Sequence, residues 1–339
     1  MRSLRAGALS VLVIALVVGL GWASGPLATA PTPSLTAALA SVPSGTTVVG
    51  FTDWRRIRDS GVPVDELSER DVSTRSELAR SRAAMQELMG WSVDDLAWEA
   101  FAQGGGPGVL VAALDGLSPD AVEVGLGDAG FVPSTGGWTA GPGVLTRTGL
   151  STVLEHVVVL ERERLVVAAE TPAATAAVVE VVRGGAPALS ADREAVAVAQ
   201  ALAGSDAVLL QRAGVGCDAA RLTSEESLRQ ADVALESVGP LASHTTSGRA
   251  ITDRGGDGMG AQTVRFAMAF DAAATAREQA RIRESVSTGP FIGRTGQVEQ
   301  VLRLVDSRTR GRVLTLEFER DPARDVVMTA TGPLLFAAC

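Results

Sequence analysis

The side chains with the widest chemical range in this sequence are two cysteines and two histidines. Cys217 and Cys339 could bind a soft metal ion, act as thiolate nucleophiles or join as a disulfide. His156 and His244 could act as bases or as metal ligands. Their irregular spacing does not match the closely spaced ligand pairs of a zinc site, so we predict no metal site. We predict a disulfide between the two cysteines, the default pairing in an oxidising compartment.

Hydrolytic chemistry would need a nucleophile beside a base, and the sequence offers no framework for one. It contains no Gly-x-Ser-x-Gly motif, which would present a serine on a strained turn. The hydroxyl residues nearest to His244 in the sequence are Ser243, Thr245, Thr246 and Ser247. We interpret this cluster as the polar face of a strand. A Cys217–His pair would need a free thiolate, which a disulfide removes. We therefore predict no catalytic residue and no cofactor.

Two glycine-rich segments resemble ligand-binding loops. Gly104–Gly108 could cradle a phosphate, but such a loop must lead into a helix, and here a strand follows. Asp253–Gly258 lacks the regular acidic spacing and the distal glutamate of a calcium loop. We predict that both segments are hairpin loops, the second one solvated.

Tryptophans and acidic pairs give two further candidates. Exposed tryptophans would mark a binding surface, whereas buried ones would pack the core. The relevant residues are Trp54, Trp91, Trp98 and Trp138, and we favour core packing under the N-terminal half. Glu225 and Glu226 are interpreted as a solvated helix N-terminus, where acids favour the helix dipole.

Composition excludes several function classes. The sequence has no Lys, Asn or Tyr, and its thirty basic residues are all Arg. Schiff-base chemistry, a tyrosine acid and an asparagine oxyanion donor are therefore excluded. The net charge is −9, and Arg alternates with Asp and Glu without forming a basic stripe. Nucleic-acid binding thus lacks its electrostatic footprint.

Residues 1–30 have the layout of an export segment. Arg2 and Arg5 precede an uncharged run from Ala6 to Ala23. Small side chains at −3 and −1 allow cleavage after Ala23 or after Ala30, and Pro31 disfavours the second site. The run is also close to the length of a membrane-spanning helix, so a cleaved signal peptide and an uncleaved single-pass anchor both stay open. Either form predicts a protein exported to the cell envelope or secreted.

Alternation and helix-end signals predict an α+β fold. A strand over 47–51 and a helix over 74–89 precede four strand-strand-helix units. The expected strand pairs are 96–103 with 108–114, 156–160 with 165–169, 243–252 with 262–270, and 298–306 with 312–318. Such repetition predicts antiparallel sheets with helices on one face, in a ferredoxin-like duplication. The expected organisation is an export segment over 1–30, a linker over 31–45, an N-terminal α+β domain over 46–212, a helical connector over 213–239 and a C-terminal α+β domain over 240–339.

The order of these features resembles a group of envelope-anchored, actinobacterial-type proteins of unknown function built from duplicated α+β modules. The resemblance rests on the leader, Gly50-Phe51, Asp128-Ala129-Gly130-Phe131 and Leu189-Ser190-Ala191-Asp192. It implies an envelope location and carries over no functional residue.

Three functions follow as hypotheses. The first is a non-catalytic role, structural or binding an envelope protein or a cell-wall polymer. The second is a carrier of a lipid or another hydrophobic ligand, because Val-, Leu- and Ala-rich layers could leave an apolar cavity. The third is a hydrolase. No nucleic-acid partner is expected, and membrane contact is expected through the N-terminal segment if it is uncleaved.

Overall fold

The structure is a computed structural model, and it describes residues 34–62, 66–222, 224–253, 262–292, 295–320 and 334–339. The predicted export segment, with its cleavage positions Ala23 and Ala30, lies outside the described residues. In the described part of the chain, no helix combines the length and the apolar character needed to cross a bilayer. Residues Pro33–Cys339 form one compact unit, to which the following description applies.

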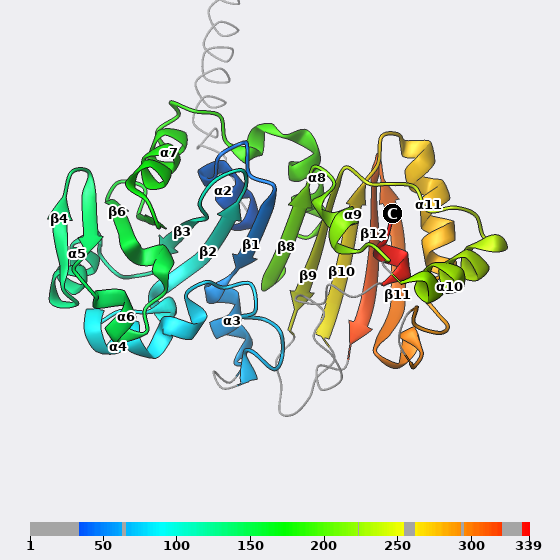
Figure 1. The fold of residues 1–339 in the computed structure, drawn as a ribbon, viewed down its shortest axis with the longest axis horizontal. Helices are drawn as coiled ribbons and strands as arrows, with labels where there is room; N and C mark the ends of the chain where they lie inside the picture. Colours follow the sequence, from blue (N-terminus) through cyan, green and yellow to red (C-terminus); the bar gives the residue numbers. More distant parts are fainter. Residues whose placement is uncertain (1–33, 63–65, 223, 254–261, 293–294, 321–333) are drawn as a thin grey trace, which may run out of the picture. The chain divides into compact units, whose positions relative to one another are not determined.

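The described residues form one twelve-stranded sheet, shown in Figure 1. Its strands are β1 (Val48–Thr52), β2 (Leu96–Gln103), β3 (Val109–Leu114), β4 (Phe131–Ser134), β5 (Gly137–Ala140), β6 (His156–Leu160), β7 (Leu165–Ala169), β8 (Ala207–Arg212), β9 (Thr246–Thr252), β10 (Gln262–Ala269), β11 (Leu302–Arg310) and β12 (Val313–Arg320). Their spatial order is β11-β12-β10-β9-β8-β1-β2-β3-β7-β6-β5-β4. Each pair of neighbours in this order is antiparallel.

Helices connect and cover these strands. The α-helices are α2 (Ser34–Ser41), α3 (Trp54–Ser60), α4 (Arg82–Met89), α5 (Pro119–Asp128), α6 (Val144–Thr148), α7 (Pro172–Val182), α8 (Arg193–Ala201), α9 (Val215–Ala219), α10 (Glu225–Glu236) and α11 (Ala273–Ser285). The 3-10 turns are η2 (Ala79–Ser81), η3 (Val93–Asp95), η4 (Thr152–Glu155), η5 (Leu189–Ala191), η6 (Val298–Gln300) and η7 (Leu335–Ala337). The fold class predicted from the sequence, α+β with antiparallel pairing, is confirmed.

The sheet contains the same strand order twice. In the N-terminal half, β1-β2-β3-β7-β6 are neighbours in that order, and in the C-terminal half the order is β8-β9-β10-β12-β11. A helix follows the third strand of each half, α5 in one and α11 in the other. The predicted duplication is therefore present. In both halves the strands have the split β-α-β arrangement of ferredoxin-like folds, because β7 pairs antiparallel between β3 and β6, and β12 pairs antiparallel between β10 and β11.

The two halves share one sheet, so the predicted separation into two domains is wrong. Val48–Thr52 of β1 pairs with Ala207–Gln211 of β8, and Figure 1 shows these strands side by side. The expected helical connector over 213–239 is present as two helices, α9 and α10, between β8 and β9. Both edges of the joint are apolar strands whose backbone groups need partners, and pairing with each other satisfies them.

Helices cover both faces of the sheet, and not one face as we predicted. Leu110 and Ala112 of β3 belong to one apolar core together with Met85 of α4. Val109 and Val111 belong to a second core on the opposite face, with residues of α2, α7 and α8. Because the central strands are apolar at successive positions, each face requires a covering layer.

Two local predictions also change. The expected linker over 31–45 contains α2, which buries Leu35 and Leu39 in the second core. The helix expected over 74–89 begins only at Arg82. The backbone N–H of Glu77 donates to the Glu99 carboxylate at 2.7 Å, which holds this segment in a turn. The fourth predicted helix, after Asp321, lies outside the described residues.

Candidate functional site

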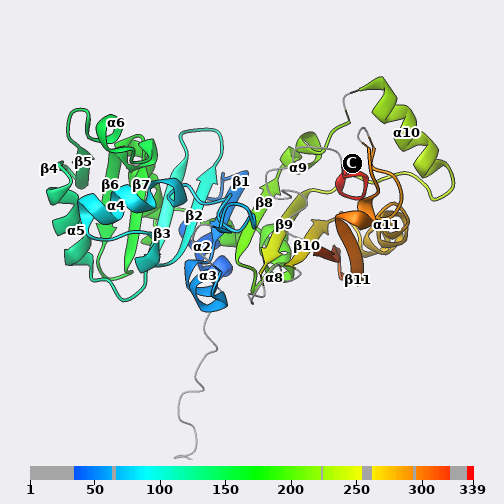
Figure 2. The same cartoon turned by 90° about the horizontal axis from the view of Figure 1, so that it is seen from below.

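Helix α10 forms where the sequence predicts a polar helix. Ser224 caps it by accepting a hydrogen bond from the N–H of Ser227 at 3.0 Å, and Glu225 and Glu226 follow in the first turn. Arg229 forms ion pairs with both glutamates. Figure 2 shows α10 at the outer edge of the C-terminal half. Of its twelve residues only Ser227 and Ala231 are buried, and the half-buried Ala234 and Leu235 also pack against the core.

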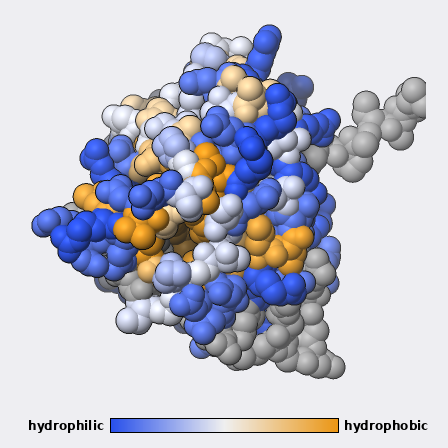
Figure 3. All heavy atoms as spheres, turned by 90° about the vertical axis from the view of Figure 1, so that its right-hand side faces the viewer, coloured by the Kyte–Doolittle hydropathy of each residue, from blue (hydrophilic) through white to orange (hydrophobic). Residues whose placement is uncertain are grey.

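A pocket of about 890 Å³ lies between α10, the end of α11 and the segment that leads to β11. Its lining residues are Glu226, Arg229, Gln230, Val233, Ala234, Ser285, Val286, Thr288, Pro290, Phe291, Ile292, Thr295, Gly296, Gln297, Val298 and Leu335. Figure 3 shows a hollow with apolar residues around it on this side of the molecule. The chain therefore contains a cavity of ligand size with a largely apolar wall.

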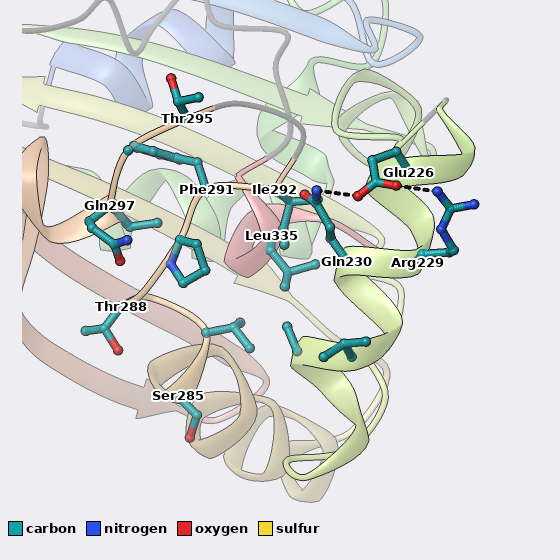
Figure 4. A pocket seen from close by; sticks show the side chains of 16 residues that line it. Glu226, Arg229, Gln230, Ser285, Thr288, Phe291, Ile292, Thr295, Gln297 and Leu335 are labelled. Atoms are coloured by element: carbon teal, nitrogen blue, oxygen red, sulfur yellow. Dashed lines mark hydrogen bonds and ion pairs between the residues drawn. The ribbon is translucent and has the colours of Figure 1, made fainter.

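Apolar and polar groups occupy different parts of the pocket. Phe291, Ile292 and Leu335 are each nearly inaccessible to solvent and form its wall. At the mouth, Gln230 Nε2 donates to Glu226 at 2.8 Å, and Arg229 donates to the same carboxylate, as Figure 4 shows. The hydrogen bond from Arg229 lowers the pKa of Glu226. One side of the mouth thus carries the charged and amide groups of α10 above an apolar wall.

The segment that supplies Leu335 is fixed by a buried arginine. The Arg283 guanidinium of α11 donates to the carbonyls of Phe336 at 2.6 Å and Ala338 at 2.8 Å, and to Ala242 at 2.8 Å. Burial lowers the pKa of Arg283 to about 10, which leaves it charged at neutral pH. Phe336 packs against Phe266 and Phe318. This wall of the pocket is therefore held in place by hydrogen bonds and packing in the core.

The predicted disulfide is present. Cys217 of α9 is bonded to Cys339, their Cα atoms are 5.3 Å apart, and 122 positions separate them in the chain. The bridge joins the segment containing Leu335 to the helix that precedes α10. A disulfide indicates an oxidising compartment outside the cytoplasm.

His244 lies beside this bridge. It is buried, its Nε2 is 3.4 Å from the carbonyl oxygen of Ala337, and its Nδ1 is 3.8 Å from Cys217 Sγ. Burial, and secondly the charge of Arg283, lowers the pKa of His244 to about 4. The neighbouring Thr245 hydroxyl donates to Glu194 at 2.6 Å and does not face the imidazole. Within the described residues, the ring of His244 contacts sulfur and a carbonyl but no carboxylate, so this cluster does not form a triad.

The other sequence candidates are dispersed over the molecule. Trp54, Trp91 and Trp98 are buried in the core as predicted, and Trp138 is half-buried. His156 begins β6, and its Nδ1 is 3.1 Å from the Thr139 hydroxyl. Together with Trp138 it lines a smaller pocket of about 270 Å³. Gly104–Gly108 connects β2 to β3 as the expected hairpin loop.

Asp253, expected in a solvated loop, is buried. Both of its carboxylate oxygens accept hydrogen bonds from Arg70 at 2.7 Å, and Gln262 donates to it at 2.8 Å. The rest of that loop, residues 254–261, lies outside the described residues. The correction follows from burial, because a carboxylate removed from water needs charged or polar partners.

Sequence reasoning missed Glu99. Its carboxylate is fully buried and accepts hydrogen bonds from Trp54 Nε1 at 2.9 Å, Ser76 Oγ at 2.9 Å and the Glu77 N–H at 2.7 Å. Burial raises its pKa. A lone acid between Trp98 and Ala100 in an apolar strand was the available signal. Its partners hold the connection between β1 and β2 against the sheet.

Comparisons with known proteins give limited matches. No protein-family model matches the chain, and no curated protein matches it. Among solved structures, crystal form IV of TP0453 is similar with a TM-score of 0.45 and 13% identity, covering 86% of this chain and 96% of that one. Crystal forms I and III of TP0453 each give a TM-score of 0.42 and 12% identity, covering 87% of this chain and 96% of theirs.

Proposed function

We propose that this protein is a non-catalytic binding protein outside the cytoplasm, and that it holds an amphiphilic ligand with an apolar body in the pocket beneath α10. The observation that carries this proposal is the cavity of about 890 Å³ with its apolar wall. Ligand sites of proteins fall in a range of about 300–1,000 Å³ and combine an apolar lining with a few polar groups. The hydrophobic-carrier hypothesis thus has geometric support.

Ala234 contributes to the open space beneath α10. It lines the cavity with a single methyl group, whereas the buried residues of the helix, Ser227 and Ala231, are not part of the lining. An apolar ligand would gain roughly 25 cal/mol for each Å² of apolar surface removed from water there.

The mouth of the pocket restricts the polar end of the ligand. The charged residues that line the pocket are Glu226 and Arg229, which pair with each other and leave no net charge at this point. A charged head group would therefore meet no excess of opposite charge there. The ligand has an uncharged polar head, for which Gln230 and Thr288 offer hydrogen bonds.

The location in the cell belongs to the same proposal. Residues 1–30 export the chain, as a signal peptide cleaved after Ala23 or Ala30 or as a single-pass anchor, and the ligand is then a lipid of the envelope. An envelope protein or a cell-wall polymer as partner is the competing hypothesis. It would need an accessible surface and not this cavity.

Ligand binding is tested with the full-length protein and the uncharged fluorescent probe N-phenyl-1-naphthylamine. Wild-type protein binds one probe per chain in the pocket. Ala234→Phe fills the cavity and weakens binding about tenfold or more, equal to about 1.4 kcal/mol. The matched control is Ala177→Phe, the same change at an exposed position of α7, which leaves binding unchanged.

Native mass spectrometry of protein purified from its own envelope complements this titration. A bound mass that is absent from Ala234→Phe supports carriage of a lipid. A bare mass, together with probe binding that Ala234→Phe does not change, would contradict the proposal.

A further inference from the structure

Three potential metal ligands converge next to the disulfide. The two Sγ atoms of Cys217 and Cys339 and a ring nitrogen of His244 all lie within 4.8 Å of one another. In a tetrahedral site, metal–sulfur bonds of about 2.3 Å and metal–nitrogen bonds of about 2.0–2.1 Å place such ligand atoms roughly 3.5–4 Å apart. Small side-chain rotations would therefore be sufficient to surround one ion.

The ring of His244 lies beside the sulfur with both nitrogens, Nδ1 at 3.8 Å and Nε2 at 4.0 Å from Cys217 Sγ. A carbonyl oxygen can only accept, so the contact of 3.4 Å with Ala337 is satisfied when Nε2 carries the proton. In that tautomer Nδ1 has the lone pair that an ion would bind. Metal-binding histidines have this arrangement, with one nitrogen donating to a carbonyl or carboxylate and the other free to bind the ion.

Each of the three residues is held by the fold itself. Gly216 lets α9 approach β9 closely, because a Cβ there would lie 2.2 Å from Ser247 Oγ and 3.3 Å from His244 Cε1. Arg283 fixes the backbone on both sides of Ala337 through the carbonyls of Phe336 and Ala338. The convergence therefore does not depend on the disulfide alone.

We propose that Cys217, Cys339 and His244 form a three-ligand site for a thiophilic ion of the zinc type when the disulfide is reduced. A dithiol reductant transfers two electrons and two protons to the bridge, which breaks the S–S bond and gives two thiols, while the reductant becomes a disulfide. The ion then displaces both thiol protons into solvent and binds two thiolates and the neutral imidazole. Cys339 is exposed, so water can occupy a fourth position. This site is independent of the ligand pocket proposed above.

The test uses cobalt(II) as a spectroscopic substitute for zinc, with the full chain reduced by a phosphine under anaerobic conditions. Reduced wild-type protein binds one Co²⁺ with a thiolate-to-cobalt charge-transfer band, and Zn²⁺ displaces it. Oxidised protein shows no such band. His244→Ala weakens binding of both ions by about a hundredfold. His156→Ala, which changes the other histidine, has no effect.

Two outcomes would overturn the site. One is a reduced wild-type protein, folded or unfolded by circular dichroism, that gives no charge-transfer band. The other is a folded His244→Ala variant with unchanged affinity for both ions, which would mean that the two thiolates bind the ion without the imidazole. If His244→Ala does not fold, His244→Cys decides, because a third thiolate keeps tight binding and its loss contradicts the proposal.

Discussion

Helices α4 and α10 belong to the same connection in their two halves, between the first and the second strand, yet they pack differently. Helix α4 buries Met85 and Met89 fully, and a Cβ on Gly125 of α5 would lie only 2.1 Å from the carbonyl oxygen of Met89. Helix α10 buries only Ser227 and Ala231, and a cavity separates it from α11. Long apolar side chains and a close helix contact at a glycine fill the N-terminal half, whereas the corresponding region beside α10 contains a cavity.

The difference shows how a duplicated fold can contain a pocket in one half and a filled core at the equivalent place in the other. The sheet and the helix after its third strand are repeated, so the scaffold needs no new element. Helix α10 has no fully buried side chain of methionine size, so it packs less apolar volume than α4. We therefore expect the C-terminal half to depend more on other restraints, namely the disulfide and the buried Arg283.

The largest expected effect comes from breaking the disulfide. Cys339→Ser removes a link that spans 122 positions, and it should lower the free energy of unfolding by about 4 kcal/mol. Urea denaturation measures this loss. Hydrogen exchange should show faster exchange at Leu335–Ala338 and α9 than at α4. Equally accelerated hydrogen exchange in both halves would mean that the bridge does not act locally on the C-terminal half.

A smaller loss of stability is expected from making a cavity beneath α4 in the N-terminal half. Met85→Ala removes a buried side chain from beneath α4 and should lower the free energy of unfolding by about 3 kcal/mol. The matched change on the other helix, Val233→Ala, affects a side chain that is 72% exposed and should stay within about 0.5 kcal/mol. Similar losses for the two variants in urea denaturation would contradict the contrast between α4 and α10.

The joint between the halves should give a pH-dependent effect of up to about 3 kcal/mol. Burial raises the pKa of Asp206 to about 6, although Arg56 contacts it and the Asp253 N–H donates to it. Because the folded state then holds its proton more tightly than the unfolded state, this group stabilises the fold most below pH about 4. That stability is lost as pH rises through about 6.

Asp206→Asn should remove this part of the pH dependence. Urea midpoints measured at intervals between pH 4 and 6 should fall less steeply for the variant than for the wild type. Parallel curves would show that the carboxyl titrates at its ordinary pKa and that the joint is better solvated than its burial indicates.

Much of the fold could be predicted from local signals. Ser118 with Pro119 and Thr171 with Pro172 mark helix starts, and the structure places side-chain caps at both. The hairpins follow from alternation around short glycine or polar turns. The helix expected from Thr74 failed because Glu99, more than twenty positions away, takes the Glu77 N–H. That contact is not visible in a local window.

The candidate sites also include one feature that the sequence could predict and others that it could not. The pairing of Cys217 with Cys339 could be predicted because two cysteines allow only one bridge. The nearness of His244 to that bridge could not, since it depends on α9 packing against the start of β9. The pocket could not be predicted either, because the sequence indicates that α10 is a polar helix without showing how far it lies from α11.

The sequence by itself determined most of the hairpins, several helix starts, the repetition of strand-strand-helix units and the single disulfide its cysteines allow. These depend on residue type and on contacts a few positions apart, such as caps, turns and alternation. Only the tertiary structure decided that the halves share one sheet, that helices cover both of its faces, and that a cavity remains beneath α10. Those outcomes depend on which strand edges meet and on how side chains of distant segments fill the space between layers, which no local pattern encodes.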